Sequence, residues 1–198
     1  QADKGWPRNP MINSGAISLV SLLPGQDARS RCENLCQWLN ERSNCHLFLD
    51  EAMLSSARSV QNQRNIAIAN LLAESGYLDE VESTLDTYKH ICCLAGTVAD
   101  LAGLGMLLVK GQAAVSPQHR RTVNALMMTC GLYQASSHFA VEVGLPTKSG
   151  ISGAMLSIVP SQGAIACYSP ALDEAGNSKA GLFLLRKLAQ TLDLSLFG

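Results

Sequence analysis

Two short apolar runs near the C-terminal end place the tightest constraint on the fold of this chain. Residues 154–160 and 164–168 are separated only by Ser161-Gln162-Gly163, a pattern that predicts a β-hairpin. Before them the sequence shows helical periodicity, and residues 179–192 predict a last amphipathic helix. Because an isolated hairpin is only marginally stable in water, some strands must come from elsewhere and helices must cover the sheet. We therefore expect an α+β fold, mostly helical, with C-terminal antiparallel strands and a terminal helix.

Capping residues mark where several of the helices begin. Asn13, Asp50 and Ser116-Pro117 each stand directly before a helical pattern, where N-cap residues are preferred. The predicted helices in this part of the chain cover residues 13–23, a segment after Asp50, and residues 28–41, 64–74, 79–93, 97–110 and 118–130.

Two of these helices carry specific expectations about burial. In residues 28–41, Leu35, Trp38 and Leu39 recur at helical spacing, and we expect this stripe to pack into the core. Residues 64–74 are almost wholly apolar, and we expect this helix to run through the middle of the domain. Gly76 should end it.

Length and composition favour one domain that binds a small molecule or another subunit. The chain has 198 residues and a formal net charge of −1, so electrostatics give no reason to expect nucleic acid or an anionic membrane as a partner. No apolar run is long enough to span a membrane and the first residues do not resemble a signal peptide, which favours a cytoplasmic location.

Cysteines and histidines indicate no metal and no cofactor. The seven cysteines form neither a C-x-x-C motif nor an even set, and we expect them to be reduced, mostly buried thiols. The four histidines show no ligand spacing.

The tripeptide Lys148-Ser149-Gly150 carries the most chemical information. In penicillin-binding proteins and class A β-lactamases, a Lys-Thr-Gly at the start of an edge strand lines the active site opposite an S-x-x-K nucleophile. Glycine lets a substrate approach the strand backbone, and lysine supplies a fixed positive charge. By itself the tripeptide is weak evidence, because such a sequence arises by chance in many loops.

Four blocks together make the motif specific. In the order of the chain they are residues 9–17 (NPMINSGAI), Arg64-Asn65, residues 143–153 (VGLPTKSGISG) and residues 168–178 (YSPALDEAGNS). In order and approximate spacing they resemble the serine-dependent glutaminases, and the resemblance extends from residue 5 to about residue 190. It implies a serine β-lactamase/DD-peptidase-like fold and hydrolysis of L-glutamine to L-glutamate and ammonia through a serine acyl-enzyme. It also implies a homodimer or homotetramer.

The resemblance assigns roles to residues that match the family's motifs. Asn13, Asn65 and Tyr88 match substrate-binding positions, and Lys148-Ser149-Gly150 lines the same site. Tyr133 matches the tyrosine beside the nucleophile, a proton relay, and Ile151 matches the residue whose backbone N–H forms half of the oxyanion hole.

Each assignment has a structural alternative. Asn13 and Asn65 would also serve as helix caps. Tyr88 and Tyr133 would fit equally as half-buried core tyrosines with solvated hydroxyls, and Lys148 as a surface charge.

Two departures from the family pattern stand out. The family's S-x-x-K precedes the N-P-M-x-N block, yet no S-x-x-K occurs in the 198 residues. We therefore expect a single glutaminase-like domain over residues 1–198 that lacks the family's N-terminal strands and nucleophile helix, as in a cleaved or truncated chain or an unusual gene product. In addition, Arg58 stands seven residues before Asn65, where the family has a glutamate that binds the α-ammonium of the substrate.

Three functions remain in competition at this point. The first is a glutaminase whose catalytic unit is complete only in a longer chain. The second is a related amide or β-lactam hydrolase in which Arg58 selects an anionic group. The third is a non-catalytic packing or oligomerisation fragment. An S-x-x-K in the parent sequence would favour the first two.

Overall fold

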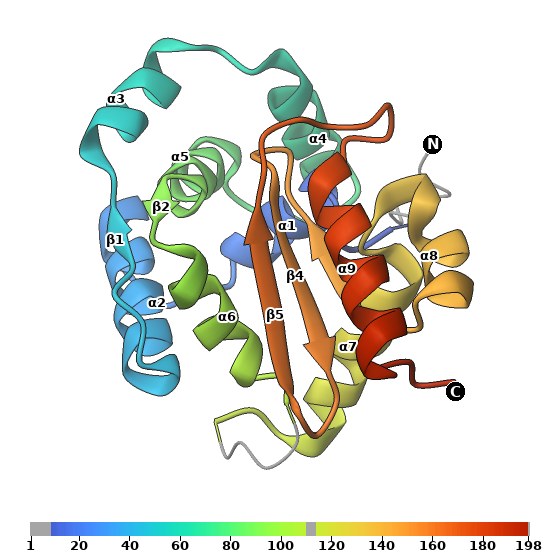
Figure 1. Cartoon of the computed structure of the whole chain (residues 1–198). Helices are drawn as coiled ribbons and strands as arrows, with labels where there is room; N and C mark the ends of the chain where they lie inside the picture. Colours follow the sequence, from blue (N-terminus) through green and yellow to red (C-terminus); the bar gives the residue numbers. More distant parts are fainter. Residues whose placement is uncertain (1–8, 110–113, 198) are drawn as a thin grey trace. The chain divides into compact units, whose positions relative to one another are not determined.

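The structure, a computed structural model, describes residues 9–109 and 114–197 and divides into two compact units. The first unit comprises residues 9–41 and 46–96, and the second comprises residues 42–45, 97–109 and 114–197 (Figure 1). Every helix in the described ranges is too short or too polar to cross a lipid bilayer.

The first unit is almost entirely helical. Its elements are α1 (Asn13–Val20), α2 (Ala28–Ser43), β1 (Phe48–Leu49), α3 (Glu51–Ser59), α4 (Gln63–Glu74), α5 (Val81–Cys92) and β2 (Leu94–Ala95), with β1 and β2 paired antiparallel. Helices α1, α4 and α5 pack against one another around a core of Ile17, Ala69, Leu72 and Leu78.

Local capping signals predicted helix starts well. Met53 N donates a 2.9 Å hydrogen bond to Asp50 Oδ1, so Asp50 caps α3 as expected. Ser116 caps α7 in the same way by accepting from the backbone N–H of His119. Asn13 does not cap α1, because the helix begins after Ile12 and Asn13 already lies in its first turn.

Predictions of burial for two helices were wrong. In α2 the buried side chains are Ala28 and Cys32, whereas Trp38 is 36% exposed. In α4 only Ala69 and Leu72 are buried, and Leu71 is 48% exposed, so α4 lies at the surface of its unit. Neither sequence shows which face of an apolar helix meets its neighbours.

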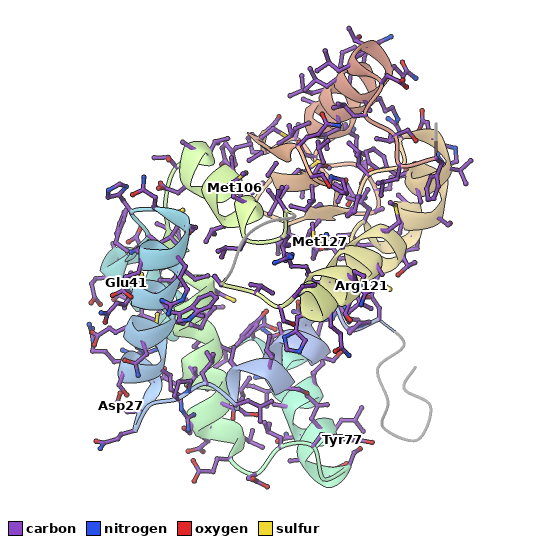
Figure 2. The ribbon with its side chains drawn as sticks, turned by 90° about the horizontal axis from the view of Figure 1, so that it is seen from below. Asp27, Glu41, Tyr77, Met106, Arg121 and Met127 are labelled. Atoms are coloured by element: carbon purple, nitrogen blue, oxygen red, sulfur yellow. The ribbon has the colours of Figure 1, made fainter. Side chains whose placement is uncertain are left out.

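The second unit contains the predicted hairpin and terminal helix. Its elements are α6 (Val98–Met106), α7 (Pro117–Cys130), a 3₁₀ helix at Tyr133–Ala135, α8 (Ser136–Glu142), β3 (Thr147–Ser149), β4 (Ala154–Val159), β5 (Gly163–Tyr168) and α9 (Lys179–Leu192). Helix α6 ends at Met106, which is exposed, while Met127 on α7 is buried (Figure 2). The predicted last residue of this helix, residue 110, lies outside the described residues.

The strands form one antiparallel sheet in the order β3-β4-β5. Strand β3 supplies the additional strand that the hairpin requires, and it contains the first two residues of the K-S-G motif. Thr147 is paired with Ser157, and Val159 with Gly163. The sheet lies between α6 and α9 (Figure 1).

Alternate residues of the hairpin face these two helices. At Gly105 of α6, an added Cβ would lie 2.5 Å from Ala164 Cβ and 2.8 Å from Leu156 Cδ1, so glycine permits the close approach of α6 to this face. On the opposite face, Met155 and Val159 join Leu182 and Leu185 of α9 in the main core of the unit. Both faces of the sheet are therefore covered by helices.

Candidate functional site

The K-S-G motif lies on edge strand β3 with its side chains on alternate faces. Thr147 and Ser149 are buried, and the Thr147 hydroxyl lies 2.6 Å from that of Ser157. Lys148 points to the other face and is partly buried. Its Nζ donates a hydrogen bond to the Ser149 carbonyl and lies 5.3 Å from the centroid of the Tyr133 ring. Burial lowers the pKa of the Lys148 ammonium.

Tyr133 adopts a backbone conformation that is unfavourable for its residue type. Its φ angle is +54°, in the left-handed region that bulky side chains rarely enter, which costs about 1–3 kcal/mol. Neighbouring contacts hold it there: Leu132 N donates to Ser136 Oγ, and this hydroxyl donates to the Tyr133 carbonyl. Strain of this kind persists where surrounding structure enforces it, commonly at functional sites.

Asn177 connects the K-S-G strand to the backbone beside Tyr133. The Ser149 hydroxyl donates a 2.5 Å hydrogen bond to Asn177 Oδ1, and Asn177 Nδ2 donates a 3.3 Å bond to the Leu132 carbonyl. Asn177 is completely buried. No structural role was assigned to Asn177 from the sequence, although it lies in the 168–178 block. Nothing in the sequence shows that this asparagine hydrogen-bonds residues 28 and 45 positions away.

Ile151 follows the motif in a turn and is 77% exposed. An added Cβ at Gly176 would lie 3.6 Å from Tyr133 Cε2 and 3.9 Å from Ile151 Cγ2, so Gly176 brings both side chains beside the 173–178 turn. Among the described residues, no acceptor for the Ile151 backbone N–H is found. This is the property that an oxyanion-hole donor requires.

The second unit thus brings together one group of predicted site residues. The group consists of Tyr133, Lys148, Ser149, Gly150 and Ile151, joined by Asn177.

The first unit brings together a second group. Asn13 Nδ2 on α1 donates a 2.9 Å hydrogen bond to Asn65 Oδ1 on α4, and both amides lie at the surface. Asn65 is held in the first turn of α4, where its backbone N–H donates to the cap residue Asn62. Tyr88 on α5 is half-buried and packs against the core between these helices. The predicted meeting of the two groups in one site stays a prediction.

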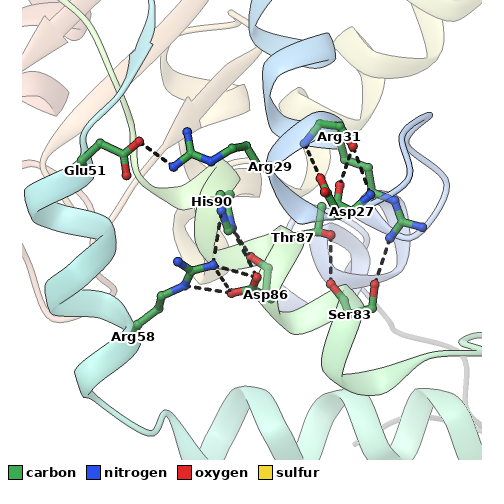
Figure 3. A network of polar contacts seen from close by, with 10 residues as sticks. Asp27, Arg29, Arg31, Glu51, Arg58, Ser83, Asp86, Thr87 and His90 are labelled. Carbon is green, nitrogen blue, oxygen red and sulfur yellow. Dashed lines mark hydrogen bonds and ion pairs between the residues drawn. The ribbon is translucent and has the colours of Figure 1, made fainter.

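Arg58 on α3 forms an ion pair with Asp86 on α5. Its Nε and Nη2 each donate a 3.1 Å hydrogen bond to Asp86 Oδ1, and Nη2 also donates a 2.9 Å bond to Asp86 Oδ2 (Figure 3). These bonds raise the pKa of the Arg58 guanidinium. Asp86 stands two residues before Tyr88 on α5. The arginine is therefore neutralised by a carboxylate instead of being an isolated positive charge.

Buried His90 completes this network. Its Nδ1 lies 2.8 Å from the Asp86 carbonyl oxygen, which can only accept, so Nδ1 carries the hydrogen. In the neutral ring Nε2 is then an acceptor, and it lies 3.4 Å from Arg58 Nη2. Arg58 is thus oriented by two groups on α5, the Asp86 carboxylate and the His90 ring (Figure 3).

Comparison with known proteins decides the family. The Glutaminase family model matches residues 1–197. This chain belongs to the glutaminase family. A glutaminase from Synechocystis sp. is 44% identical over 192 residues, which cover 96% of this chain and 59% of the relative. Glutaminase 2 from Bacillus cereus is 36% identical over 211 residues, covering 98% and 64%. The chain therefore spans about three fifths of the length of these glutaminases.

Solved glutaminase structures share the fold. The structure of the Bacillus subtilis glutaminase YbgJ in covalent complex with 5-oxo-L-norleucine matches with a TM-score of 0.88 and 36% identity, covering 96% of this chain and 70% of that chain. The native form of Mglu matches with a TM-score of 0.90 and 30% identity, covering 100% and 50%. The predicted family and the α+β fold are confirmed. The single-domain boundaries and the roles of the site residues stay predictions.

Proposed function

We propose that this chain forms part of a serine-dependent glutaminase, which hydrolyses L-glutamine to L-glutamate and ammonia. The observation that carries the proposal is the match, at 36% identity, to a B. subtilis glutaminase described as a covalent complex with 5-oxo-L-norleucine. That ligand has a ketone carbon where glutamine has its side-chain amide carbon. The complex formed by reaction with 6-diazo-5-oxo-L-norleucine, so a group of that enzyme reacts covalently with a glutamine analogue, as a nucleophile would.

In the proposed reaction, a serine outside the 198 residues attacks the side-chain amide carbon of glutamine. The C–N bond breaks, the departing nitrogen takes a proton and leaves as ammonia, and water then hydrolyses the acyl-serine to glutamate. The Tyr133 hydroxyl would relay the proton, and the Ile151 backbone N–H would donate to the oxyanion. The strained backbone of Tyr133 and the available N–H of Ile151 support these roles.

The remaining site residues would bind the substrate. As the resemblance implies, Asn13, Asn65 and Tyr88 would contact glutamine, Asn65 at its α-carboxylate end, and Lys148-Ser149-Gly150 would also bind the substrate. Lys148 lacks a carboxylate partner among the described residues, so its charge would favour negative charge developing in the site. No cofactor or metal is required by this chemistry.

A chimaera tests the proposed function. The part of the Synechocystis glutaminase that this chain does not match would be joined ahead of residues 1–198, and glutamate release would be measured. We expect turnover of L-glutamine, with a Tyr133→Phe chimaera at least about a hundredfold slower because proton transfer is lost. A folded chimaera that releases no glutamate would contradict the proposal and favour the packing or oligomerisation alternative.

One observation favours altered specificity as a second candidate. The α-ammonium of glutamine needs an acceptor, and Arg58 can only donate. With Asp86 paired to it, the region presents an ion pair and not a single carboxylate. An amide substrate with an anionic or neutral group at this position would suit the pair better than an ammonium does.

The charge at position 58 separates the two candidates. In the chimaera we expect Arg58→Glu to lower KM for L-glutamine about tenfold, equivalent to about 1.4 kcal/mol of ground-state binding, because two carboxylates would then face the ammonium. Arg58→Gln, which removes the charge without inverting it, should give an intermediate KM. Steady-state kinetics on L-glutamine provide the measurement. Identical KM values in all three proteins would place Arg58 outside the substrate site.

For assembly and location, we propose a cytoplasmic homodimer or homotetramer. The resemblance to the serine-dependent glutaminases supports the oligomer. Light scattering on the purified chimaera measures the number of subunits.

A further inference from the structure

Two hydrogen bonds hold the peptide groups on either side of the Tyr133 Cα atom. Asn177 Nδ2 donates to the Leu132 carbonyl, which belongs to the peptide group before Tyr133. The Ser136 hydroxyl donates to the Tyr133 carbonyl, which belongs to the peptide group after it. Because φ and ψ are the rotations of these two peptide groups about the Cα atom, the two bonds together hold Tyr133 in its left-handed conformation. The strain of that conformation is comparable with the contribution of one buried hydrogen bond, so loss of either bond should let φ relax.

The same asparagine also holds the strand that leads to Ile151. Its Oδ1 accepts the 2.5 Å hydrogen bond from the Ser149 hydroxyl, and Ser149 lies two residues before Ile151. Gly153 N donates a 3.0 Å hydrogen bond to the Gly150 carbonyl, which closes the turn that contains Ile151 directly after the strand. A shift of Ser149 would therefore move the Ile151 backbone N–H with it.

Asn177 is held in place by the turn that contains it. Asp173 Oδ1 accepts from the backbone N–H groups of Ala175 at 3.0 Å and of Asn177 at 2.8 Å, and Asp173 N donates to the Asn177 carbonyl. The next residue, Ser178, caps α9 by accepting from Gly181 N, and both Asn177 and Ser178 are completely buried. The turn is thus joined to a helix that packs in the main core of the unit.

We propose that Asn177 is a positioning residue for the glutaminase reaction, which holds the Tyr133 hydroxyl and the Ile151 backbone N–H in place relative to each other. One end of its amide binds the peptide group before Tyr133, and the other binds the strand before Ile151. Because the proton relay and the oxyanion donor are taken from the proposed function, this role rests on that proposal. Asn177 is completely buried, so it acts through these two residues and not on the substrate.

Kinetics of the chimaera described above give the functional test. Asn177→Leu should lower kcat about a hundredfold, because misplacing catalytic groups by about 1 Å has an effect of this size, while KM should change less than about twofold. Rates are divided by the concentration of sites that react covalently with 6-diazo-5-oxo-L-norleucine, so that unfolded protein does not lower kcat. Leu185→Ala, which destabilises the same unit by removing core volume on α9, is the matched control and should leave kcat per reactive site unchanged. A normal kcat in Asn177→Leu, or an equally low kcat in both variants, would overturn the proposal.

Aspartate at position 177 provides a rescue experiment. A protonated carboxyl reproduces the donor and the acceptor of the amide, whereas an ionised carboxylate can only accept and would face the Leu132 carbonyl. Burial raises the pKa of a carboxyl at this position, and the nearby Asp173 carboxylate raises it further. Relative to the parent chimaera at the same pH, kcat of Asn177→Asp should therefore rise at least about tenfold as the pH falls from about 8 to about 5. A relative kcat as low at the acidic end of this range as at the alkaline end would count against the role of Asn177.

A spectroscopic readout on the isolated chain does not depend on glutaminase activity. A positive φ brings the N–H and Hα protons of a residue close together, so Tyr133 should give a strong NOE between these two protons. In Asn177→Leu this NOE should weaken at least about twofold, and in Leu185→Ala it should keep its strength. An inactive parent chimaera would contradict the proposed function alone, and the NOE would still decide whether Asn177 holds Tyr133. Equal NOE strength in the parent chain and in Asn177→Leu would overturn the proposal.

Discussion

The isolated 198-residue chain is expected to release no glutamate from L-glutamine. An acyl-enzyme needs an activated nucleophile. The resemblance to the serine-dependent glutaminases implies that this nucleophile is the serine of an S-x-x-K motif, and no such motif occurs in the sequence. The oxyanion donor and the tyrosine do not replace it, since they act only on an attack that another group begins. We expect a rate at least about a million-fold below that of the chimaera, the effect of removing a catalytic serine.

Covalent labelling gives a sharper readout than turnover. The YbgJ complex formed by reaction with 6-diazo-5-oxo-L-norleucine. The same reagent should add one 5-oxo-L-norleucine group to the chimaera and none to the isolated chain, as measured by intact mass. Because the chain has seven cysteines, the control is a sample whose thiols were blocked beforehand. A stoichiometric adduct on the thiol-blocked isolated chain would show that the nucleophile lies within residues 1–198.

Features set by neighbouring residues were predictable from the sequence. Asp50 and Ser116 cap the helices that follow them, and the boundaries of α9 match the predicted residues 179–192. The hairpin also follows from local signals, since the turn at Ser161 adopts the left-handed conformation, with φ +67°. Capping and turn preferences act over a few residues, so they can be read without knowledge of the fold.

Features that depend on distant contacts were not predictable. The sequence favours Asn13 as a cap, but its amide hydrogen-bonds Asn65, 52 residues away. Arg58 was recognised only as standing where the family has a glutamate, and the sequence did not show its bidentate contact with Asp86, which joins residues 28 positions apart. Burial of Trp38 failed for the same reason: an apolar stripe shows that a helix has a packing face, not how far the neighbouring elements extend along it.

Replacement of Asn177 by leucine is expected to be the most destabilising change in the second unit. Leucine has the same number and branching of side-chain heavy atoms as asparagine, but it is bulkier and cannot bind the Ser149 hydroxyl or the Leu132 carbonyl. Both groups are buried in the present network. Leaving them without hydrogen-bond partners should reduce the free energy of unfolding by about 2–4 kcal/mol, because each buried unsatisfied group costs about 1–3 kcal/mol. Gln190→Leu on the exposed face of α9 is the control, with an expected change within about 0.5 kcal/mol.

A double-mutant cycle separates the network from a general loss of packing. Ser149→Ala removes one of the two groups that Asn177→Leu leaves unsatisfied. Asn177→Leu should therefore reduce the free energy of unfolding by about 1 kcal/mol less in the Ser149→Ala background than in the parent chain. Urea unfolding followed by circular dichroism gives all four free energies. If the two costs simply add, the hydrogen bond between Ser149 and Asn177 contributes nothing to stability. In that case other contacts would hold the K-S-G strand beside this segment, including the 3.2 Å hydrogen bond that Ser149 N donates to the Gly131 carbonyl and the surrounding core.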